Sequence, residues 1–167
     1  MVPQERVRGL LGAPTYTSGN RWQYRYEETQ VEIAFNAGGA IEAVVVALCQ
    51  GHQYAGTHPG ENADAPLGLL TLADVIEHYP SAIEYSESLR TKEVYTRGRW
   101  GPPGAWTYYS YGALYVNTGV GHLQEVDFSW DKTSNQLVSE PKSVLINWMA
   151  LMSSYGEPPG FDWFIKS

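Results

Sequence analysis

The sequence predicts a single α+β domain spanning residues 1–167. In it, two helix-plus-β-meander repeats form one mainly antiparallel sheet, with helices packed on one face and a further helix at the C-terminus. Three observations lead to this fold class. The 167 residues are 43% apolar, which suits one domain with a proper core. Apolar and polar residues alternate with a period of two through 21–48, and apolar residues recur at helical spacing through 141–155.

The first repeat, residues 1–50, is expected to contain a short helix and a three-stranded meander. Three apolar residues on one helical face precede Gly12 and Pro14, which end the helix. Aromatic and β-branched residues then alternate with polar ones through 21–35, which predicts two strands. Two adjacent glycines supply the positive φ angles of a tight turn, and the β-branched run 41–48 is the third strand.

The second repeat, residues 69–131, is expected to follow the same plan around an insertion. Thr71 caps a helix in which Asp74 stands three residues on, and Pro80 ends this helix. The ten residues that follow fit either a helix or a loop. Strand-like runs then occur at 93–97, 106–111, 113–117 and 123–130. The insertion, which the first repeat lacks, contains residues 99–106.

The segment 139–156 is expected to form the C-terminal helix. Pro141 suits a first helical turn, and Gly156 ends the segment. A stripe at helical spacing comprises Val144, Leu145, Trp148, Met149, Met152 and Tyr155. We expect this stripe to be core, with Trp148 buried against the sheet, and not a cofactor-binding surface.

Several short motifs of the first repeat occur together in a known family. They are Leu10-Leu11-Gly12-Ala13-Pro14, Trp22-Gln23-Tyr24, Val31-Glu32-Ile33-Ala34-Phe35 and Gly38-Gly39-Ala40-Ile41. This segment resembles the SmpA/OmlA module of the outer-membrane assembly lipoproteins. A tandem pair of such modules is similar to the β-lactamase-inhibitor proteins. The resemblance covers 7–48 well and 70–130 in outline.

The resemblance implies a bacterial envelope protein that acts through protein contacts and has no active site. Cys49 is the one cysteine, so the sequence lacks both the lipidated N-terminal cysteine of the lipoproteins and the paired cysteines of the inhibitors. Lipid anchoring and lactamase inhibition are therefore not implied. The compartment stays open. Because the first helix would extend before Met1, we expect an upstream part, which would give a periplasmic or membrane-tethered location.

The charge balance argues against nucleic acid and anionic membranes as partners. Eleven basic and eighteen acidic side chains give a net charge of −7, and such a chain repels phosphate groups. No stretch approaches the roughly eighteen apolar residues of a membrane-spanning helix, so direct membrane insertion is not expected. The partner is expected to be another protein, whose identity and stoichiometry the sequence does not give.

Catalytic, metal and cofactor sites are not predicted. Cys49, His52 and His58 have the spacing Cys-x2-His-x5-His, but no second pair of zinc ligands follows. We interpret them as a buried thiol and two loop histidines. The nucleophile-elbow, phosphate-loop and dinucleotide motifs do not occur. Glu84 and Glu87 are interpreted as solvated charges.

The aromatic insertion is the candidate binding site. Its residues are Trp100, Pro102, Pro103, Trp106 and Tyr108. The adjacent prolines stiffen the loop, and rigid aromatic side chains offer apolar area at little entropic cost. The alternative is that one or both tryptophans fold back onto the sheet and cover its edge.

The function predicted from the sequence is a non-catalytic protein-binding module of a bacterial envelope or secretion-associated protein, a class that includes inhibitors and immunity proteins. Two other classes stay open. One is a carbohydrate-binding module in which Trp100 and Trp106 form a stacking platform, which coplanar exposed rings would favour. The other is an enzyme of unrecognised family that uses His52, His58 or a glutamate. A cavity holding a histidine and a carboxyl group with shifted pKa would favour it.

Overall fold

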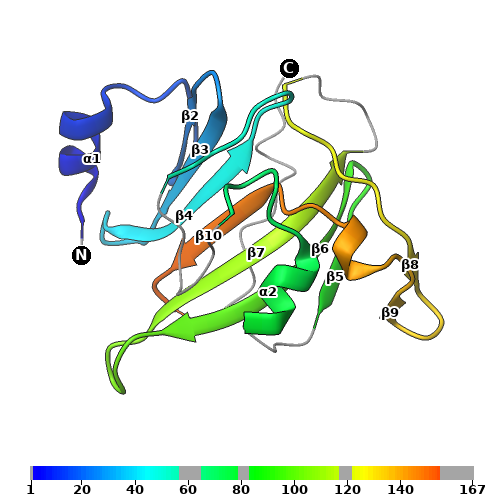
Figure 1. Ribbon diagram of the computed structural model, residues 1–167. Coiled ribbons are helices and arrows are strands. Elements are labelled where there is room, and N and C mark those ends of the chain that lie inside the picture. The colour runs from blue at the N-terminus through cyan, green and yellow to red at the C-terminus, as the bar shows by residue number, and fades with distance from the viewer. Residues whose placement is uncertain (1, 57–64, 79–82, 117–121, 155–167) are drawn as a thin grey trace.

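The computed structural model describes residues 2–56, 65–78, 83–116 and 122–154, and the fold is mainly β (Figure 1). One antiparallel sheet of eight strands has the spatial order β1-β2-β3-β4-β10-β7-β6-β5. Its strands are β1 Tyr16–Ser18, β2 Arg21–Arg25, β3 Thr29–Phe35, β4 Ile41–Leu48, β5 Glu84–Glu87, β6 Thr91–Trp100, β7 Thr107–Val116 and β10 Trp148–Met152. The smaller elements are α1 Gln4–Leu11, α2 Leu72–His78, the 3-10 turn η1 Pro141–Ser143, and a hairpin of β8 Trp130–Asp131 and β9 Gln136–Leu137.

The expected α+β class is therefore wrong, and so is the plan of two helix-plus-meander repeats closed by a C-terminal helix. The described residues contain two short α-helices against an eight-stranded sheet. The first meander, β1 to β4, and the second, β5 to β7, do not meet, because β10 lies between β4 and β7. No helix in the described part of the chain is long and apolar enough to cross a membrane.

The three strands expected between residues 21 and 48 are confirmed as β2, β3 and β4. Trp22 lies opposite Ile33, and Ile33 opposite Val44, so that apolar side chains line up across one face. The helix expected to end at Gly12 is also confirmed as α1. Gly12 has φ of 79° and ψ of −163°, a combination that essentially only glycine adopts.

Helix α2 begins after Thr71, as the sequence predicts. The Asp74 backbone N–H donates to Thr71 Oγ1 at 3.3 Å, and the Thr71 N–H donates to the Asp74 carboxylate at 2.8 Å. This reciprocal pair is a capping box with Asp in the usual Glu position. Leu70, Leu72 and Val75 are buried, which fixes α2 against the sheet.

The expected C-terminal helix is instead the central strand β10. Trp148 lies opposite Ala47 of β4 on one side and Gly112 of β7 on the other. Between residues 139 and 154, only Pro141–Ser143 is helical, as the turn η1. Four of the five residues of β10 are buried, so both faces of this strand are apolar and the alternation of a half-exposed strand is missing. Trp148 is nevertheless fully buried, as expected.

Strand β7 runs unbroken through Gly112, where the sequence suggested two strands. The Trp148 indole covers this glycine: a Cβ at Gly112 would lie 2.2 Å from Trp148 Cε2. Glycine is needed here for packing and does not end the strand. The strand expected at 123–130 is also wrong, because Leu123 forms an isolated bridge with Cys49 and regular pairing begins only at β8.

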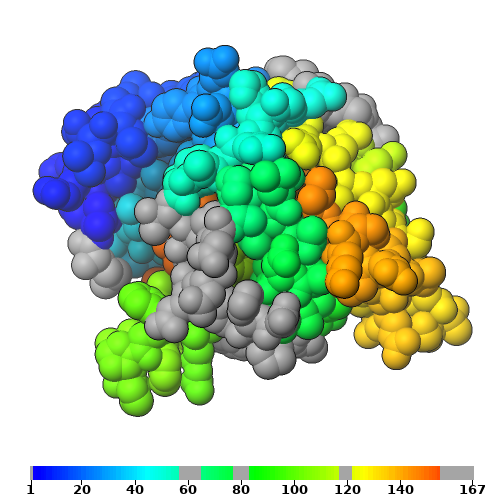
Figure 2. Space-filling model, viewed as in Figure 1, coloured from blue at the N-terminus to red at the C-terminus, as the bar shows by residue number. Residues whose placement is uncertain are grey.

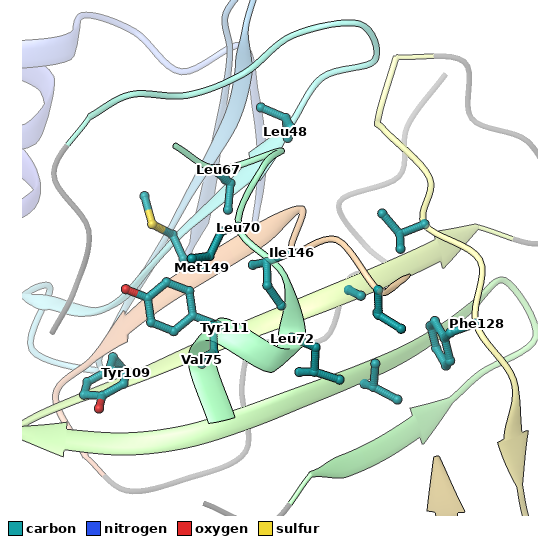
Figure 3. Packing of buried hydrophobic residues seen from close by; sticks show 14 residues of the cluster. Leu48, Leu67, Leu70, Leu72, Val75, Tyr109, Tyr111, Phe128, Ile146 and Met149 are labelled. Atoms are coloured by element: carbon teal, nitrogen blue, oxygen red, sulfur yellow. The ribbon is translucent and has the colours of Figure 1, made fainter. Parts of the chain in front are cut away.

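The two faces of the sheet carry separate cores. We call the face covered by α2 the helix face and the opposite one the far face. On the helix face, Tyr111 and Met149 pack against Leu70, Leu72 and other side chains from outside the sheet (Figure 3). On the far face the buried apolar residues include Val45, Ala47, Tyr95, Leu114, Trp148 and Ala150.

Candidate functional site

The hairpin that joins β6 to β7 carries the candidate binding residues and projects from the body of the molecule (Figure 2). Its ladder ends with Arg99 opposite Tyr108 and Trp100 opposite Thr107. We call residues 99–108 the hairpin tip. Because the two strands are paired up to the turn, the tip is an extension of the rigid sheet and not a loop laid over its edge.

Glycines and prolines shape the turn of the hairpin tip. The Ala105 N–H donates to the Pro102 carbonyl at 3.0 Å, and Gly104, which follows Pro103, has φ of 86°. These features define a type II turn. Gly101 has φ of 114°, and a Cβ there would lie 2.8 Å from the Ala105 carbonyl oxygen. The sequence thus restricts this turn to few conformations.

The two tryptophans of the hairpin tip lie on opposite faces. Side chains alternate along β6, so neighbouring Arg99 and Trp100 point in opposite directions. The Arg99 guanidinium lies over the Trp106 ring, with Cζ 4.3 Å from the ring centroid, so Trp106 shares the face of Arg99. The Trp100 side chain is 50% exposed, while Trp106 is half-buried. The two rings do not form one coplanar platform.

The five residues predicted from the sequence are brought together in the hairpin tip. Pro102 and Pro103 are exposed at the turn, and Tyr108 is half-buried at the start of β7. The sequence reasoning missed Arg99, although it stands directly before Trp100. Its importance depends on the hairpin register, which places it over Trp106 and opposite Tyr108.

The hairpin tip is a basic part of an acidic protein. No Asp or Glu occurs between residues 97 and 124. Arg97 pairs through two N–H groups with the Glu84 carboxylate on β5. Arg99, in contrast, has no carboxylate partner among the residues that the structure describes. A hollow of about 520 Å³ beside the tip is lined by Arg97, Gly98, Arg99 and Tyr108.

Glu84 and Glu87, interpreted above as solvated charges, are both in ion pairs. Glu84 binds Arg97, and Glu87 lies 2.5 Å from the Lys132 ammonium group. Hydrogen bonds from Lys132 and Tyr85 lower the pKa of Glu87. Neither carboxylate is therefore placed to act as half of an acid–base pair with the other.

A chain of buried polar side chains crosses part of the far face and was not predicted. His122, in the segment after β7, donates through Nε2 to Gln30 Oε1 at 2.6 Å. The Gln30 amide donates to Glu32 Oε1 at 2.6 Å, and the Gln23 amide reaches the same oxygen at 3.4 Å. Gln23, Gln30 and Glu32 are each at most 2% exposed.

Burial shifts the titration of this polar chain. It raises the pKa of Glu32 to about 10, although hydrogen bonds from Gln30 and Gln23 and the charge of Arg21 act in the opposite direction. The carboxyl group is therefore neutral at pH 7. Burial also lowers the pKa of His122, which agrees with a neutral imidazole donating to Gln30.

The polar chain contains a histidine and a carboxyl group with shifted pKa, the combination that an enzyme would need. However, Gln30 stands between them, and Glu32 is 1% exposed. A general acid must reach the atom that it protonates, and this carboxyl group is shielded. The chain therefore serves to tie β2, β3 and the segment after β7 together. The alternation of polar and apolar residues along 31–35 predicts a solvent-facing Glu32, so its burial is not evident from the sequence.

The Cys49 thiol is buried, and burial raises its pKa. Its S–H points to the Tyr26 carbonyl oxygen, with a sulfur–oxygen distance of 3.7 Å. His52 is half-buried, and His58 lies outside the described residues. Within the described ranges, no group of three His, Cys, Asp or Glu side chains is arranged to hold a metal ion.

Comparison with known proteins gives a structural neighbour but no family. No family model matches the chain, and no curated protein matches it in sequence. Among solved structures, the chain is similar to a DUF4309 family protein (YjgB) from Bacillus subtilis subsp. subtilis str. 168. The TM-score is 0.47 at 9% sequence identity, and the alignment covers 91% of this chain and 78% of that chain.

Proposed function

We propose that this domain is a non-catalytic module that binds a partner protein through its hairpin tip. The observation that carries the proposal is the pairing of a projecting, conformationally restricted turn with a tryptophan side chain that is 50% exposed. Large apolar side chains usually gain free energy by burial in the core. Trp100 lies at the end of β6, beyond the core, so the exposed half of its surface can contact a partner.

The rigidity of the hairpin tip supports the same proposal. The type II turn of Pro102 to Ala105 and the stacking of Arg99 on Trp106 hold the tip in one shape before binding. A surface that is already ordered loses less entropy when it binds, so more of the contact energy appears as affinity. Tryptophan, tyrosine and arginine are also the residue types that contribute most to protein interfaces.

Protein binding suits this geometry better than binding of a sugar. Stacking on a carbohydrate chain needs rings that share one exposed plane, whereas Trp100 and Trp106 face opposite ways. A protein partner can enclose the projecting tip and contact both faces. The resemblance of residues 7–48 to SmpA/OmlA modules agrees with a module that acts through protein contacts, and on that basis we place it in the bacterial envelope.

The proposal is tested by capture followed by measured affinity. Immobilised wild-type domain is exposed to an extract of the source organism, and proteins that it retains but the bare resin does not are identified. Calorimetry then gives the affinity of the purified partner for both forms. We expect Trp100→Ala to weaken binding by more than about 1 kcal/mol, the usual hot-spot threshold.

The matched control is Leu89→Ala. Leu89 is 98% exposed in the turn between β5 and β6, so it is also an exposed apolar side chain but lies outside the hairpin tip. This variant should bind like the wild type, and both variants should melt at the wild-type temperature. Equal affinity of the Trp100→Ala variant and the wild type for the captured protein would refute the proposal.

A further inference from the structure

We infer that the hairpin tip recognises a carboxylate side chain within an acidic segment of the partner protein, and that Arg99 binds it in the hollow beside Tyr108. This inference rests on the proposed function and adds the chemistry of the partner. It follows from the geometry of Arg99, the pairing of Arg97 and the distribution of charge along the chain.

The Arg99 guanidinium is oriented by Trp106 and keeps its hydrogen-bond donors available. Its Cζ lies over the Trp106 ring, 4.3 Å from the centroid, so the indole holds the guanidinium in place. The N–H donors of a guanidinium lie in its plane and point outward, away from a ring stacked on its face. A carboxylate approaching in this plane can accept two parallel hydrogen bonds. Arg99 is exposed and, within the described ranges, has no carboxylate partner.

The hollow provides charge for one anionic group. Arg97 and Arg99 both line it, on the same face of β6, because they stand two residues apart on one strand. The Glu84 carboxylate already neutralises Arg97 through two hydrogen bonds. The remaining positive charge is that of Arg99, which matches a single carboxylate better than a doubly charged phosphate.

The size and walls of the hollow also suit a side chain of a protein. Its volume of about 520 Å³ exceeds that of one acidic residue and leaves room for the flanking backbone. Gly98 adds no side chain to the wall, and Tyr108 stands opposite Arg99 in the strand register. A carboxylate bound to Arg99 would therefore lie beside an aromatic ring, where the apolar part of its own side chain can pack.

The charge of the whole chain favours docking of an acidic segment at this place. The protein carries eighteen acidic against eleven basic residues, so most of its surface repels such a segment. The stretch from 97 to 124 has no acidic residue and includes the whole hairpin tip. Complementary charge at one site and repulsion elsewhere select the orientation of an encounter more than they raise affinity.

The first test uses a defined probe on the whole domain. A fluorescein-labelled peptide of alternating glutamate and glycine is titrated with the protein, and fluorescence anisotropy reports binding. The matched peptide has glutamine in place of glutamate. We expect the acidic peptide to bind and the glutamine peptide to bind at least about tenfold more weakly, since charged hydrogen bonds are the stronger ones. Equal binding of the two peptides would overturn the inference.

Three substitutions locate the interaction. Arg99→Gln should lower the affinity for the acidic peptide about tenfold or more. Arg99→Lys keeps the charge but cannot donate two parallel hydrogen bonds to a carboxylate, so it should lower the affinity by an intermediate factor. Arg90→Gln changes the net charge by the same amount at an exposed site in the turn before β6, and it should change the affinity less than about twofold. Equal losses in the Arg99→Gln and Arg90→Gln variants would show non-specific attraction and overturn the inference. A thermal melt of each variant confirms that it folds.

Two further measurements separate this inference from alternatives. Inorganic phosphate added at constant ionic strength should not displace the acidic peptide; displacement would point to a phosphate site and refute carboxylate recognition. The captured partner is then titrated with the Trp100→Ala and Arg99→Gln variants. If Trp100→Ala weakens its binding and Arg99→Gln does not, the inference fails while the proposed function stands. If Trp100→Ala has no effect, the proposed function itself fails.

Discussion

Replacing Glu32 by glutamine should stabilise the protein at neutral pH. Glu32 is 1% exposed, and its pKa is about 10 in the folded protein against 4.5 in an unstructured chain. Between these values the unfolded chain has released a proton that the folded protein keeps. The contribution of Glu32 to stability is therefore greatest below pH 4.5 and is lost as the pH rises toward 10. At pH 7, about 2.5 pH units above the unfolded pKa, the loss is on the order of 3 kcal/mol at 1.36 kcal/mol per unit.

Glutamine has the shape of the neutral carboxyl group and keeps the hydrogen bonds that its oxygen accepts. Its oxygen can accept from Gln30 and Gln23 as Glu32 Oε1 does, and its amide nitrogen takes the place of Oε2. Oε2 of Glu32 is buried without a hydrogen-bond partner among the described residues, so the amide N–H groups placed there cost part of the gain. The assay is urea unfolding at pH 4, 7 and 9, with Glu42→Gln as an exposed control on β4. We expect Glu32→Gln to add up to about 3 kcal/mol at pH 7, more at pH 9 and almost nothing at pH 4. A gain that is the same at all three values, or that the control shares, would refute the reasoning.

Four other predictions concern the sheet, the hairpin tip and metal ions. Gly112→Ala should cost about 1–3 kcal/mol in urea unfolding, because its Cβ would lie 2.2 Å from the buried Trp148 indole. Asn147→Ala should cost at least about 2 kcal/mol by the same assay, because the Asn147 side chain bonds both the N–H and the carbonyl of Leu114. Trp100→Ala should change the free energy of unfolding by less than about 1 kcal/mol, and a larger loss would show that this ring supports the fold. A chelator should leave the melting temperature unchanged, whereas a drop of several degrees would reveal a structural metal.

The turn of the hairpin tip was predictable because its signals are local. Adjacent prolines between glycines indicate a stiff turn, and two tryptophans within seven residues indicate a candidate binding surface. The separation of Trp100 and Trp106 onto opposite faces was not predictable, since it depends on which residues of β6 and β7 lie opposite each other. The same register gives Arg99 its place on Trp106.

The sequence alone determined the elements that are stabilised by residues close to one another along the chain. The alternation through 21–48 specifies three strands because side chains two positions apart lie on the same face of a strand, which collects the apolar ones on one side. The Thr71 and Asp74 pair specifies the start of α2 because the capping bonds span three residues. In both cases the physical cause and the pattern lie within a few positions of each other.

The features that depend on pairing with distant strands were decided only by the tertiary structure. The apolar residues from Val144 to Met152 fit a helix or a strand, and pairing with β4 and β7 on either side selects the strand. Burial on both faces of that strand removes the alternation that would have identified it. The same long-range packing covers Glu32 and raises its pKa. Solvent exposure is set by the whole fold. The sequence around a polar residue of an alternating strand therefore does not tell whether its side chain faces water or the protein interior.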